Sequence, residues 1–315
     1  MIAISVVMAV HNCAAKLAPT LDSILHQTEG DFELLIVDDG STDATPNLLA
    51  EYAACDRRVR VITQTNQGLT RSLITGCNAA QGTYIARHDA DDLSHPQRFA
   101  IQKRPLDDNP DLVFVSCGTE YVGPRGEPLY VEHGSGAAAK PIPILDLSRE
   151  HGIVDGPTHH GSVMMRRDAY IAAGGYRQEF YFGQDWDLWY RLAAIGRFQV
   201  LPDVLYVARI SPGSISTAWR DTQTRLSKLS NAAMRARAAG EDERAILEQA
   251  RMIGPPPGRT GENADGLYFI GEALRRRGDP AARRYLCQAI AARPWMLRAW
   301  LRWSQSLIGI PAVRR

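Results

Sequence analysis

The sequence of 315 residues contains few cysteines, almost no net charge and no long apolar run. Its five cysteines are odd in number and none form a Cys-x-x-Cys pair, which argues against a zinc site or a disulfide framework. The net charge of +1 argues against a nucleic-acid-binding protein. No apolar stretch approaches the roughly 20 residues of a membrane-spanning helix. The apolar run at residues 2–10 has no basic residues before it, so we expect a buried strand of a cytoplasmic protein rather than a secretory signal.

The charges are distributed unevenly along the chain. Residues 1–219 hold 18 basic and 26 acidic side chains, whereas residues 220–315 hold 18 basic and 9 acidic ones. At roughly 150 residues per domain, this length allows about two structural units. We therefore expect a catalytic domain over residues 1–218 and a C-terminal helical region over residues 219–315, which is rich in Ala, Leu and Arg.

Strand and helix patterns alternate through the first half of the chain. Apolar runs predict strands at residues 2–10, 33–37, 59–63, 83–88 and 112–116. Helical spacings of apolar residues separate the first four of these runs. Such alternation is typical of an α/β fold with a mostly parallel, Rossmann-like sheet flanked by helices. Ligands of these sheets bind beyond the carboxyl ends of the strands, so the polar residues there are the first candidates for a site.

Further elements are predicted after residue 116. Pro124-Arg-Gly126 predicts the turn of a hairpin, and a short strand reaches Met165. Helices are expected over about residues 168–173 and 185–194, followed by a strand that ends near Tyr206. Residues 219–252 and 264–309 have helical composition and are separated by a segment with three consecutive prolines.

Three acidic clusters lie at the ends of predicted elements. They begin at Asp38, Asp89 and Asp185. Any one of them alone suits a turn or a helix N-cap, but like charges at one sheet edge need a cation or a cationic partner. In an extended segment the carboxylates of Asp89 and Asp91 point the same way. Two carboxylates on one side can hold Mg²⁺ or a similar ion, which also binds phosphate oxygens. The pattern indicates a metal-diphosphate ligand.

Seven short motifs occur in the order and spacing of a known family. They are Val6-Val-Met-Ala-Val-His-Asn12, Asp38-Asp-Gly-Ser-Thr-Asp43, Asn66-Gln-Gly-Leu-Thr-Arg71, Asp89-Ala-Asp-Asp92, His160-Gly-Ser-Val-Met164, Gly174-Gly-Tyr176 and Asp185-Trp-Asp-Leu-Trp189. Over about residues 1–216 the sequence resembles the inverting family-two nucleotide-sugar glycosyltransferases of the GT-A fold.

The resemblance implies a role for each matched residue. Nucleotide-binding positions are Ala9, His11, Asp38, Asp39, Arg71 and Asp89. Asp91 matches the ligand of a Mn²⁺ or Mg²⁺ ion, and Asp185 matches the general base that takes the proton of the acceptor hydroxyl. His160, Trp186 and Arg209 are candidates for contacts with the diphosphate or the acceptor. The implied donor is a UDP- or TDP-sugar, and the implied acceptor is a hydroxyl of a glycan or a lipid-linked glycan in surface-polysaccharide synthesis.

Two departures from the family pattern keep other functions open. Gln184 stands where Glu usually precedes the base, and Ser211 stands where a late loop often carries His. One alternative is therefore a non-catalytic nucleotide-sugar-binding protein. Another is a phosphotransfer enzyme of the haloacid dehalogenase type, but that chemistry needs two Asp residues two positions apart, whereas Asp38 and Asp39 are adjacent.

Several residues also have ordinary structural interpretations. Trp186 and Trp189 share one helical face and suit a core, and Asp187 is spaced to form a helical ion pair with Arg191. Residues 293–309 mix Trp with Arg in a helical pattern. This mixture suits a helix lying on an anionic membrane surface, at the inner face of the cell membrane, or one whose Trp residues pack on the catalytic domain.

Overall fold

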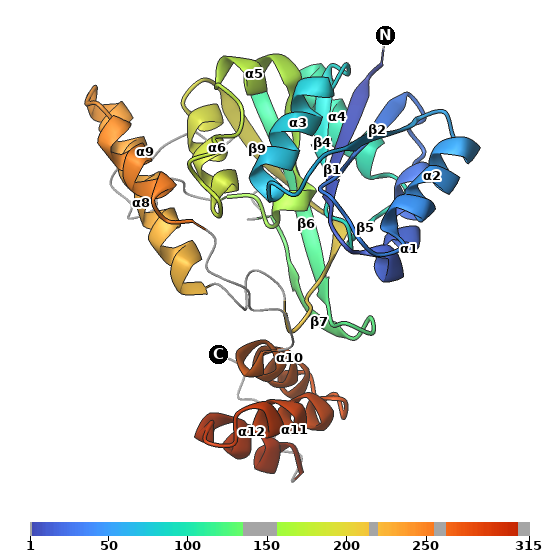
Figure 1. Ribbon diagram of the computed structural model, residues 1–315, viewed down its shortest axis with the longest axis vertical. Coiled ribbons are helices and arrows are strands. Elements are labelled where there is room, and N and C mark those ends of the chain that lie inside the picture. The colour runs from blue at the N-terminus through green and yellow to red at the C-terminus, as the bar shows by residue number, and fades with distance from the viewer. Residues whose placement is uncertain (1, 135–155, 214–219, 255–262, 308–315) are drawn as a thin grey trace. The chain divides into compact units, whose positions relative to one another are not determined.

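The computed structural model describes residues 2–134, 156–213, 220–254 and 263–307 (Figure 1). The chain divides into two compact units, each made of three segments. Unit 1 comprises Met1–Thr119, Glu132–Val207 and Thr224–Pro255, and unit 2 comprises Glu120–Val131, Ala208–Gln223 and Pro256–Arg315. Because the units interleave along the chain, the domain boundary at residues 218/219 remains a sequence-based prediction. No helix in the described part of the chain is long and apolar enough to span a lipid bilayer.

The described residues contain a nine-stranded mixed sheet, in the order β3-β2-β1-β4-β8-β6-β9-β5, with β7 paired to β6. Its strands are β1 (Ile4–Val10), β2 (Phe32–Asp38), β3 (Val59–Thr63), β4 (Tyr84–Arg87), β5 (Leu93–Ser94), β6 (Leu112–Val122), β7 (Pro128–Glu132), β8 (Met164–Arg166) and β9 (Arg197–Arg209). The first four strands pair in parallel, whereas β8 runs antiparallel to β4 and β6. The parallel half of the sheet confirms the predicted α/β class.

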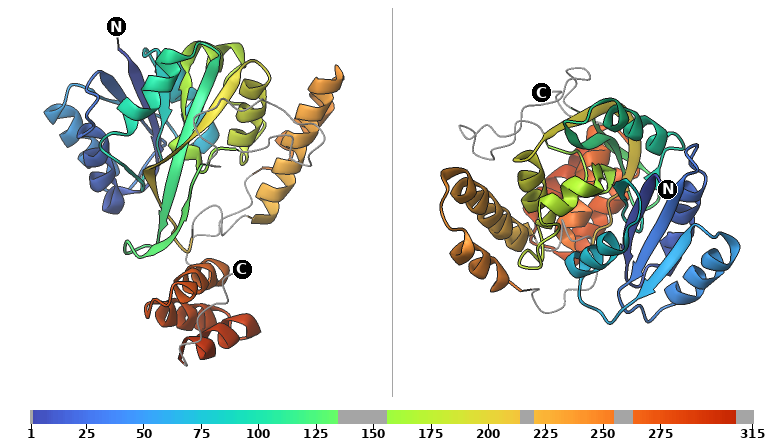
Figure 2. Two further views of the ribbon diagram at one scale, coloured as in Figure 1. Left: turned by 180° about the vertical axis from the view of Figure 1, so that it is seen from behind. Right: turned by 90° about the horizontal axis from the view of Figure 1, so that it is seen from above.

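Helices cover both faces of the sheet in unit 1 (Figure 2). They are α1 (Ala14–Leu25), α2 (Thr45–Cys55), α3 (Leu69–Ala79), α4 (Arg98–Asp108), α5 (Arg167–Ala172) and α6 (Gln184–Ala193). Successive β1 residues point to opposite faces, so Val7 packs in one core cluster with α3, α5 and α6, while Val6 and Met8 pack in another with α1 and α4. Because both faces are buried, β1 is a continuous apolar run, which is why it was visible in the sequence.

Each of the two predicted C-terminal helical stretches forms more than one helix, and a glycine follows the first helix of each. The first forms α8 (Arg220–Ala239) and α9 (Arg244–Arg251), separated by Gly240 in the left-handed conformation (φ +73°). The second forms α10 (Ala264–Arg276), α11 (Ala282–Ala292) and α12 (Leu297–Leu307). Gly278, with φ +74°, follows α10 in the same way.

Unit 2 joins the predicted hairpin to α10–α12. The tip of the β6–β7 hairpin turns at Gly126 (φ +85°), as its Pro-Arg-Gly sequence predicted. Tyr285 of α11 donates a hydrogen bond to Glu127 (2.7 Å). Gly271 of α10 lies so close to α11 that a Cβ atom would sit 2.8 Å from Leu286 Cγ. Small residues therefore allow these helices to pack tightly against each other.

Candidate active site

The carboxyl ends of β1 and β2 bring the first group of predicted residues together. Ala9 is half-buried near the end of β1. His11 follows β1, and its Nδ1 lies 3.0 Å from the carbonyl oxygen of Asp39 at the end of β2. The side-chain amide of Asn66 lies 3.2 Å from the His11 ring. Parallel pairing of β1 with β2 explains this meeting, because it puts both carboxyl ends at one edge.

Asp38 and Asp39 are buried and hold the loops around this edge. Asp38 Oδ1 accepts a hydrogen bond from the backbone N–H of Ser41 (3.0 Å). The carboxylate of Asp39 accepts from Gln64 Nε2 (2.7 Å) and from the N–H groups of Gln67 (2.9 Å) and Gly68 (2.8 Å). Burial opposes ionisation of Asp39, but these donors lower its pKa below the ordinary value. Asp39 is therefore a fixed anion that orders the loop leading into α3.

Arg71 and Tyr181 border the same edge. Arg71 is exposed on α3, and its guanidinium lies 3.4 Å from Gln67 Oε1. Gly68 has φ +86°, and a Cβ there would sit 2.8 Å from the ring of Tyr181. No motif indicated Tyr181, and its proximity to the loop held by Asp39 emerges only from the fold.

A buried cation lies at the carboxyl end of β4. Arg87 is only 1% exposed, and its Nη2 donates to Asp89 Oδ1 at 2.5 Å. Burial alone would raise the pKa of Asp89, but the Arg87 charge and nearby imidazoles hold it well below the ordinary value. The sequence feature that could have indicated this site is the position of Arg87, a charged residue within an apolar strand pattern. A charged side chain that is buried needs a partner of opposite charge.

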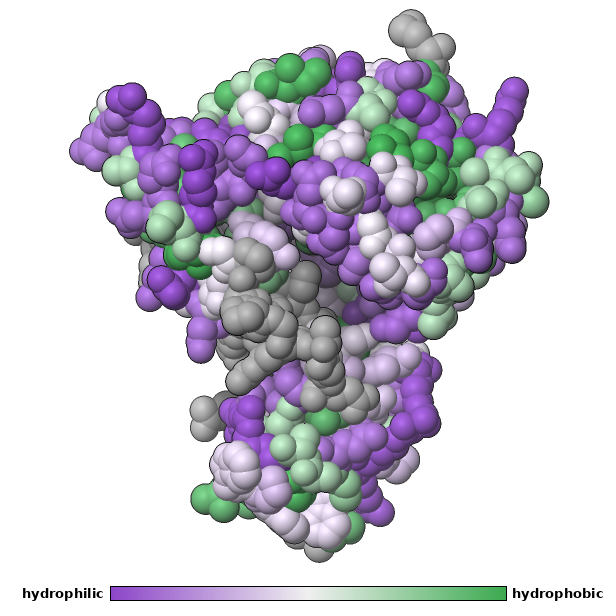
Figure 3. Space-filling model, in the orientation of Figure 1, coloured by the Kyte–Doolittle hydropathy of each residue, from purple (hydrophilic) through white to green (hydrophobic). Residues whose placement is uncertain are grey.

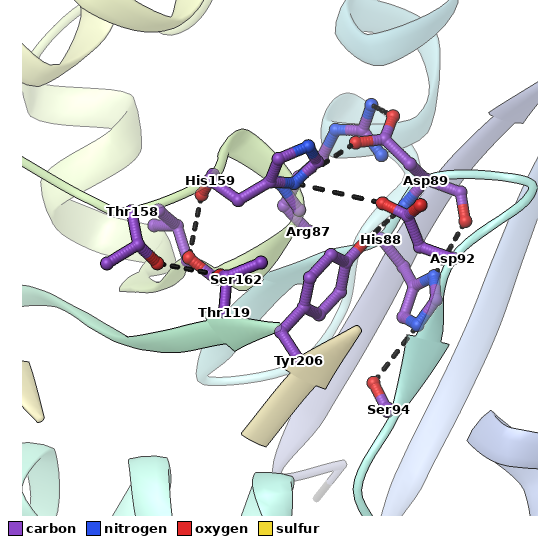
Figure 4. A network of polar contacts seen from close by, with 12 residues as sticks. Arg87, His88, Asp89, Asp92, Ser94, Thr119, Thr158, His159, Ser162 and Tyr206 are labelled. Atoms are coloured by element: carbon purple, nitrogen blue, oxygen red, sulfur yellow. Dashed lines mark hydrogen bonds and ion pairs between the residues drawn. The ribbon is translucent and has the colours of Figure 1, made fainter. Parts of the chain in front are cut away.

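Asp89, Asp92 and His159 form a compact group of metal-ligating side chains (Figure 4). His159 Nδ1 lies 3.8 Å from Oδ2 of both aspartates. The ring of His159 stacks on Tyr206 (5.3 Å between centroids), and the Tyr206 hydroxyl accepts a hydrogen bond from the Asp89 N–H (3.0 Å). One ligand atom from each of the three lies within 4.8 Å of the others. Carboxylate oxygens and an imidazole nitrogen are donors that suit Mn²⁺, so the residues fit such an ion.

Asp91 lies differently from the sequence expectation. β4 ends at Arg87, and residues 90–91 form a turn in which the Asp92 N–H approaches the Asp89 carbonyl (3.4 Å). The expected extended geometry from residue 89 to 91 is therefore wrong. The turn returns Asp92, rather than Asp91, to the side of Asp89, while Asp91 Oδ2 lies 3.4 Å from Lys16 Nζ of α1. The role of Asp91 as a metal ligand stays a prediction.

Asp185, the predicted base, is the second residue of α6. α6 follows Gly183 in the left-handed conformation (φ +72°), and Asp185 Oδ1 accepts from the Trp186 N–H (2.9 Å). Burial raises the pKa of Asp185 from 3.8 to about 6, with a further rise from the charge of Asp89 and an opposing effect of Arg87. A carboxyl poised at this pKa is suited to accept a proton near neutral pH.

Asp187 anchors α6 through a buried charge network. Its ion pair with Arg191 (2.6 Å) confirms the predicted helical pair. Asp187 is fully buried. Its Oδ1 atom is also approached by Arg177, at 3.9 Å, and by Arg237, which belongs to α8, at 4.0 Å. Both of these arginines pair with Glu243, which precedes α9. The network thus ties the helix of the predicted base to α8 and α9.

The remaining candidates have mixed surroundings. His160 Nε2 lies 2.7 Å from the Tyr176 hydroxyl, and burial lowers the pKa of His160 well below its ordinary value, so it is neutral at neutral pH. Trp186 is half-buried and packs edge-on against Trp189 (5.2 Å), as the shared helical face predicted. Arg209 ends β9 and belongs to unit 2, and its contact with a diphosphate stays a prediction.

Comparisons with known proteins agree on the family. The profile of Glycosyl transferase family 2 matches residues 5–172, more than half of the chain. EpsE of Bacillus subtilis (strain 168), which bears a glycosyltransferase name, is 36% identical over 213 residues, covering 65% of this chain and 72% of EpsE. The O-antigen biosynthesis glycosyltransferase WbnJ of Escherichia coli is 30% identical over 194 residues, covering 60% of this chain and 71% of WbnJ.

The fold also matches a solved glycosyltransferase structure. TarS from S. aureus, determined in complex with UDP-GlcNAc, aligns over 96% of this chain and 89% of that one, with a TM-score of 0.60 and 18% identity. At this identity the likeness shows the fold alone, and that fold is GT-A. The chain therefore belongs to glycosyltransferase family 2, and it is a glycosyltransferase with the GT-A fold.

Proposed function

We propose that the protein transfers a hexose from a UDP-sugar to a hydroxyl of a glycan or lipid-linked glycan, with inversion, in the synthesis of a surface polysaccharide. One observation carries this proposal. The site holds two carboxyls whose pKa values are displaced in opposite directions: that of Asp185 is raised to about 6, and that of Asp89 is lowered. Displacement of this kind separates an acid-base group from a permanent anion.

The donor side of the site is assigned to the sheet edge at β1, β2 and β4. We assign the nucleotide to Ala9, His11, Asp38, Asp39 and Arg71, with Asp89 beside the ribose. The O-antigen name of WbnJ and the UDP-GlcNAc bound to TarS support a nucleotide-sugar donor and a polysaccharide product.

The proposed cation site is made of Asp89, Asp92 and His159, with Asp91 as the sequence-based alternative. These side chains would hold a divalent cation such as Mn²⁺ or Mg²⁺, which would offset the charge of a departing diphosphate. Arg87 keeps Asp89 ionised whether or not a cation is bound, since the guanidinium lies 2.5 Å from that carboxylate. His160 and Arg209 are the further candidates for the diphosphate.

The proposed acceptor side centres on Asp185. Its carboxylate removes the proton of the acceptor hydroxyl as that oxygen attacks the anomeric carbon from the face opposite the diphosphate, which gives inversion in one step. Trp186, the next residue of α6, presents a half-buried ring to stack on an acceptor sugar. Gln184 leaves Asp185 without the second carboxyl that the family usually places beside the base.

Asp185→Asn tests the proposal. A panel of UDP- and TDP-sugars with Mn²⁺ is screened by thermal shift, and turnover is then measured as release of nucleoside diphosphate. Loss of a general base lowers turnover on the order of 100-fold or more while the donor-induced thermal shift persists. Asp168→Asn is a matched control, because Asp168 is exposed in the first turn of α5 and also accepts from the next N–H (2.7 Å). Wild-type turnover in Asp185→Asn would contradict the assignment, and donor binding without turnover in the wild type would favour the non-catalytic alternative.

A further inference from the structure

α12 has an apolar face that no described residue of unit 2 covers. Leu297, Trp300 and Leu301 are 80%, 46% and 53% exposed, and their i, i+3, i+4 spacing puts them on one side of the helix. Trp295 just before α12 (76%) and Leu307 near its end (49%) extend the set. The opposite side of α12 packs inward through the buried Ala299. We call these five exposed residues the α12 apolar face.

The surroundings of this face carry surplus positive charge. Residues 264–307 contain eight arginines and three acidic residues. Five of these arginines share two carboxylates: Arg293 and Arg298 contact Asp265, and Arg275, Arg276 and Arg302 contact Glu272. Two carboxylates cannot neutralise five guanidinium groups, so α10–α12 retain the capacity to bind anions.

Arginine also borders the apolar face directly. Arg298 follows Leu297 and lies at the margin of the α12 apolar face, whereas Arg302, which follows Leu301, pairs with Glu272 of α10 (3.5 Å) and is 33% exposed. Arg298 is 56% exposed and stacks on Tyr268 at 4.6 Å. At the lower end of Figure 3, where α12 lies, pale and green side chains adjoin purple ones. Hydrophobic and hydrophilic residues therefore share this surface.

We propose that the α12 apolar face docks on an anionic lipid surface. The leucines enter the boundary between headgroups and acyl chains, the indoles of Trp295 and Trp300 lie at headgroup level, and Arg298 contacts lipid phosphates. The arginine surplus selects this occupant over an apolar partner protein or a second copy of the chain, since the copy would bring its own positive charge. The inference rests on unit 2 and does not depend on the donor or acceptor proposed above.

Vesicle binding by the full chain tests this docking. Flotation compares vesicles of phosphatidylcholine with vesicles that also contain about 30% phosphatidylserine, at about 50 mM and about 500 mM NaCl. We expect binding to the anionic vesicles at low salt, a large loss at high salt, and none to phosphatidylcholine alone. The double variant Leu297→Ser/Leu301→Ser should bind the anionic vesicles more weakly by a factor on the order of ten or more, because two apolar side chains no longer enter the interface.

A matched double variant separates surface hydrophobicity from the α12 apolar face. Ile171→Ser/Ile195→Ser removes two apolar side chains of similar exposure (58% and 50%) from unit 1 and should bind vesicles like the wild type. Circular dichroism and the midpoint of thermal unfolding verify that each variant is folded. Equal binding by both double variants, or no flotation of the wild type at low salt, would overturn the proposal. So would light scattering without lipid that shows a wild-type oligomer dissociated by Leu297→Ser/Leu301→Ser, because a second copy would then cover the face.

Discussion

Ionisation of the buried Asp185 carboxyl should lower the free energy of unfolding of the protein, and the loss should be complete above neutral pH. Burial raises its pKa from 3.8 to about 6 in the folded chain, whereas the unfolded chain exposes the carboxyl to water. The folded state therefore binds the proton more tightly, and stability falls as the pH rises from the unfolded pKa to the folded one. The full effect is about 2 pKa units, or about 3 kcal/mol, and is reached above the folded pKa.

Asp185→Asn should remove this penalty while it removes the proposed base. The amide oxygen can still accept from the Trp186 N–H, so the local hydrogen bond is retained. At about pH 8 we expect the variant to be more stable than the wild type by about 3 kcal/mol, and at about pH 5 by about 1.5 kcal/mol. Urea unfolding at both pH values measures the difference, in which the contributions of other titrating groups cancel.

Asp168→Asn is again the control, since the side chain of Asp168 is exposed to water. Its stability should stay within about 0.5 kcal/mol of the wild type at both pH values. If Asp185→Asn is no more stable than the wild type at the higher pH, or if its advantage does not shrink on acidification, the Asp185 carboxyl has an ordinary pKa and the argument for a poised base is refuted.

Two further predictions concern the charge clusters. Asp187→Ala leaves the guanidinium group of Arg191 buried without its carboxylate partner, so urea unfolding should show a loss of about 3–5 kcal/mol; a loss below about 1 kcal/mol would mean that water replaces the pair. Mn²⁺ affinity, measured by the electron paramagnetic resonance of the free ion, should fall on the order of tenfold or more in Asp92→Asn and His159→Gln. A fall confined to Asp91→Asn would restore the sequence-based ligand.

In the parallel half of the fold, β1, β2 and β4 were predictable because they are buried on both faces. Residues 59–63 were predicted as a strand with the observed ends, and the run ending at Val10 differed only at its start. β6 extends to Val122, well beyond the predicted end at Ser116, because its second part pairs with β7 in the hairpin. Pairing across a hairpin continues a strand into residues whose own pattern is not strongly apolar.

Only one part of the candidate site was predictable from the sequence, namely the residues that lie at the ends of parallel strands. Strand ends placed Asp38, Asp39 and Asp89 correctly, because parallel pairing brings such ends together. The grouping of Asp92 with His159 depends on the turn at residues 90–91 and on a segment 67 positions later in the chain. Side-chain direction inside a turn has no periodic signature, so spacing selected Asp91 instead.

The charge network of Asp187 links the stability of distant parts of unit 1. Opening of α9 would separate Glu243 from Arg177 and Arg237, leaving two partly buried cations beside the carboxylate that holds α6. Local opening of either helix is therefore costly to the other, and α6, α8 and α9 should behave as one cooperative unit in amide hydrogen exchange. A substitution at α9, far along the chain from the proposed base, would then loosen the helix on which that base stands.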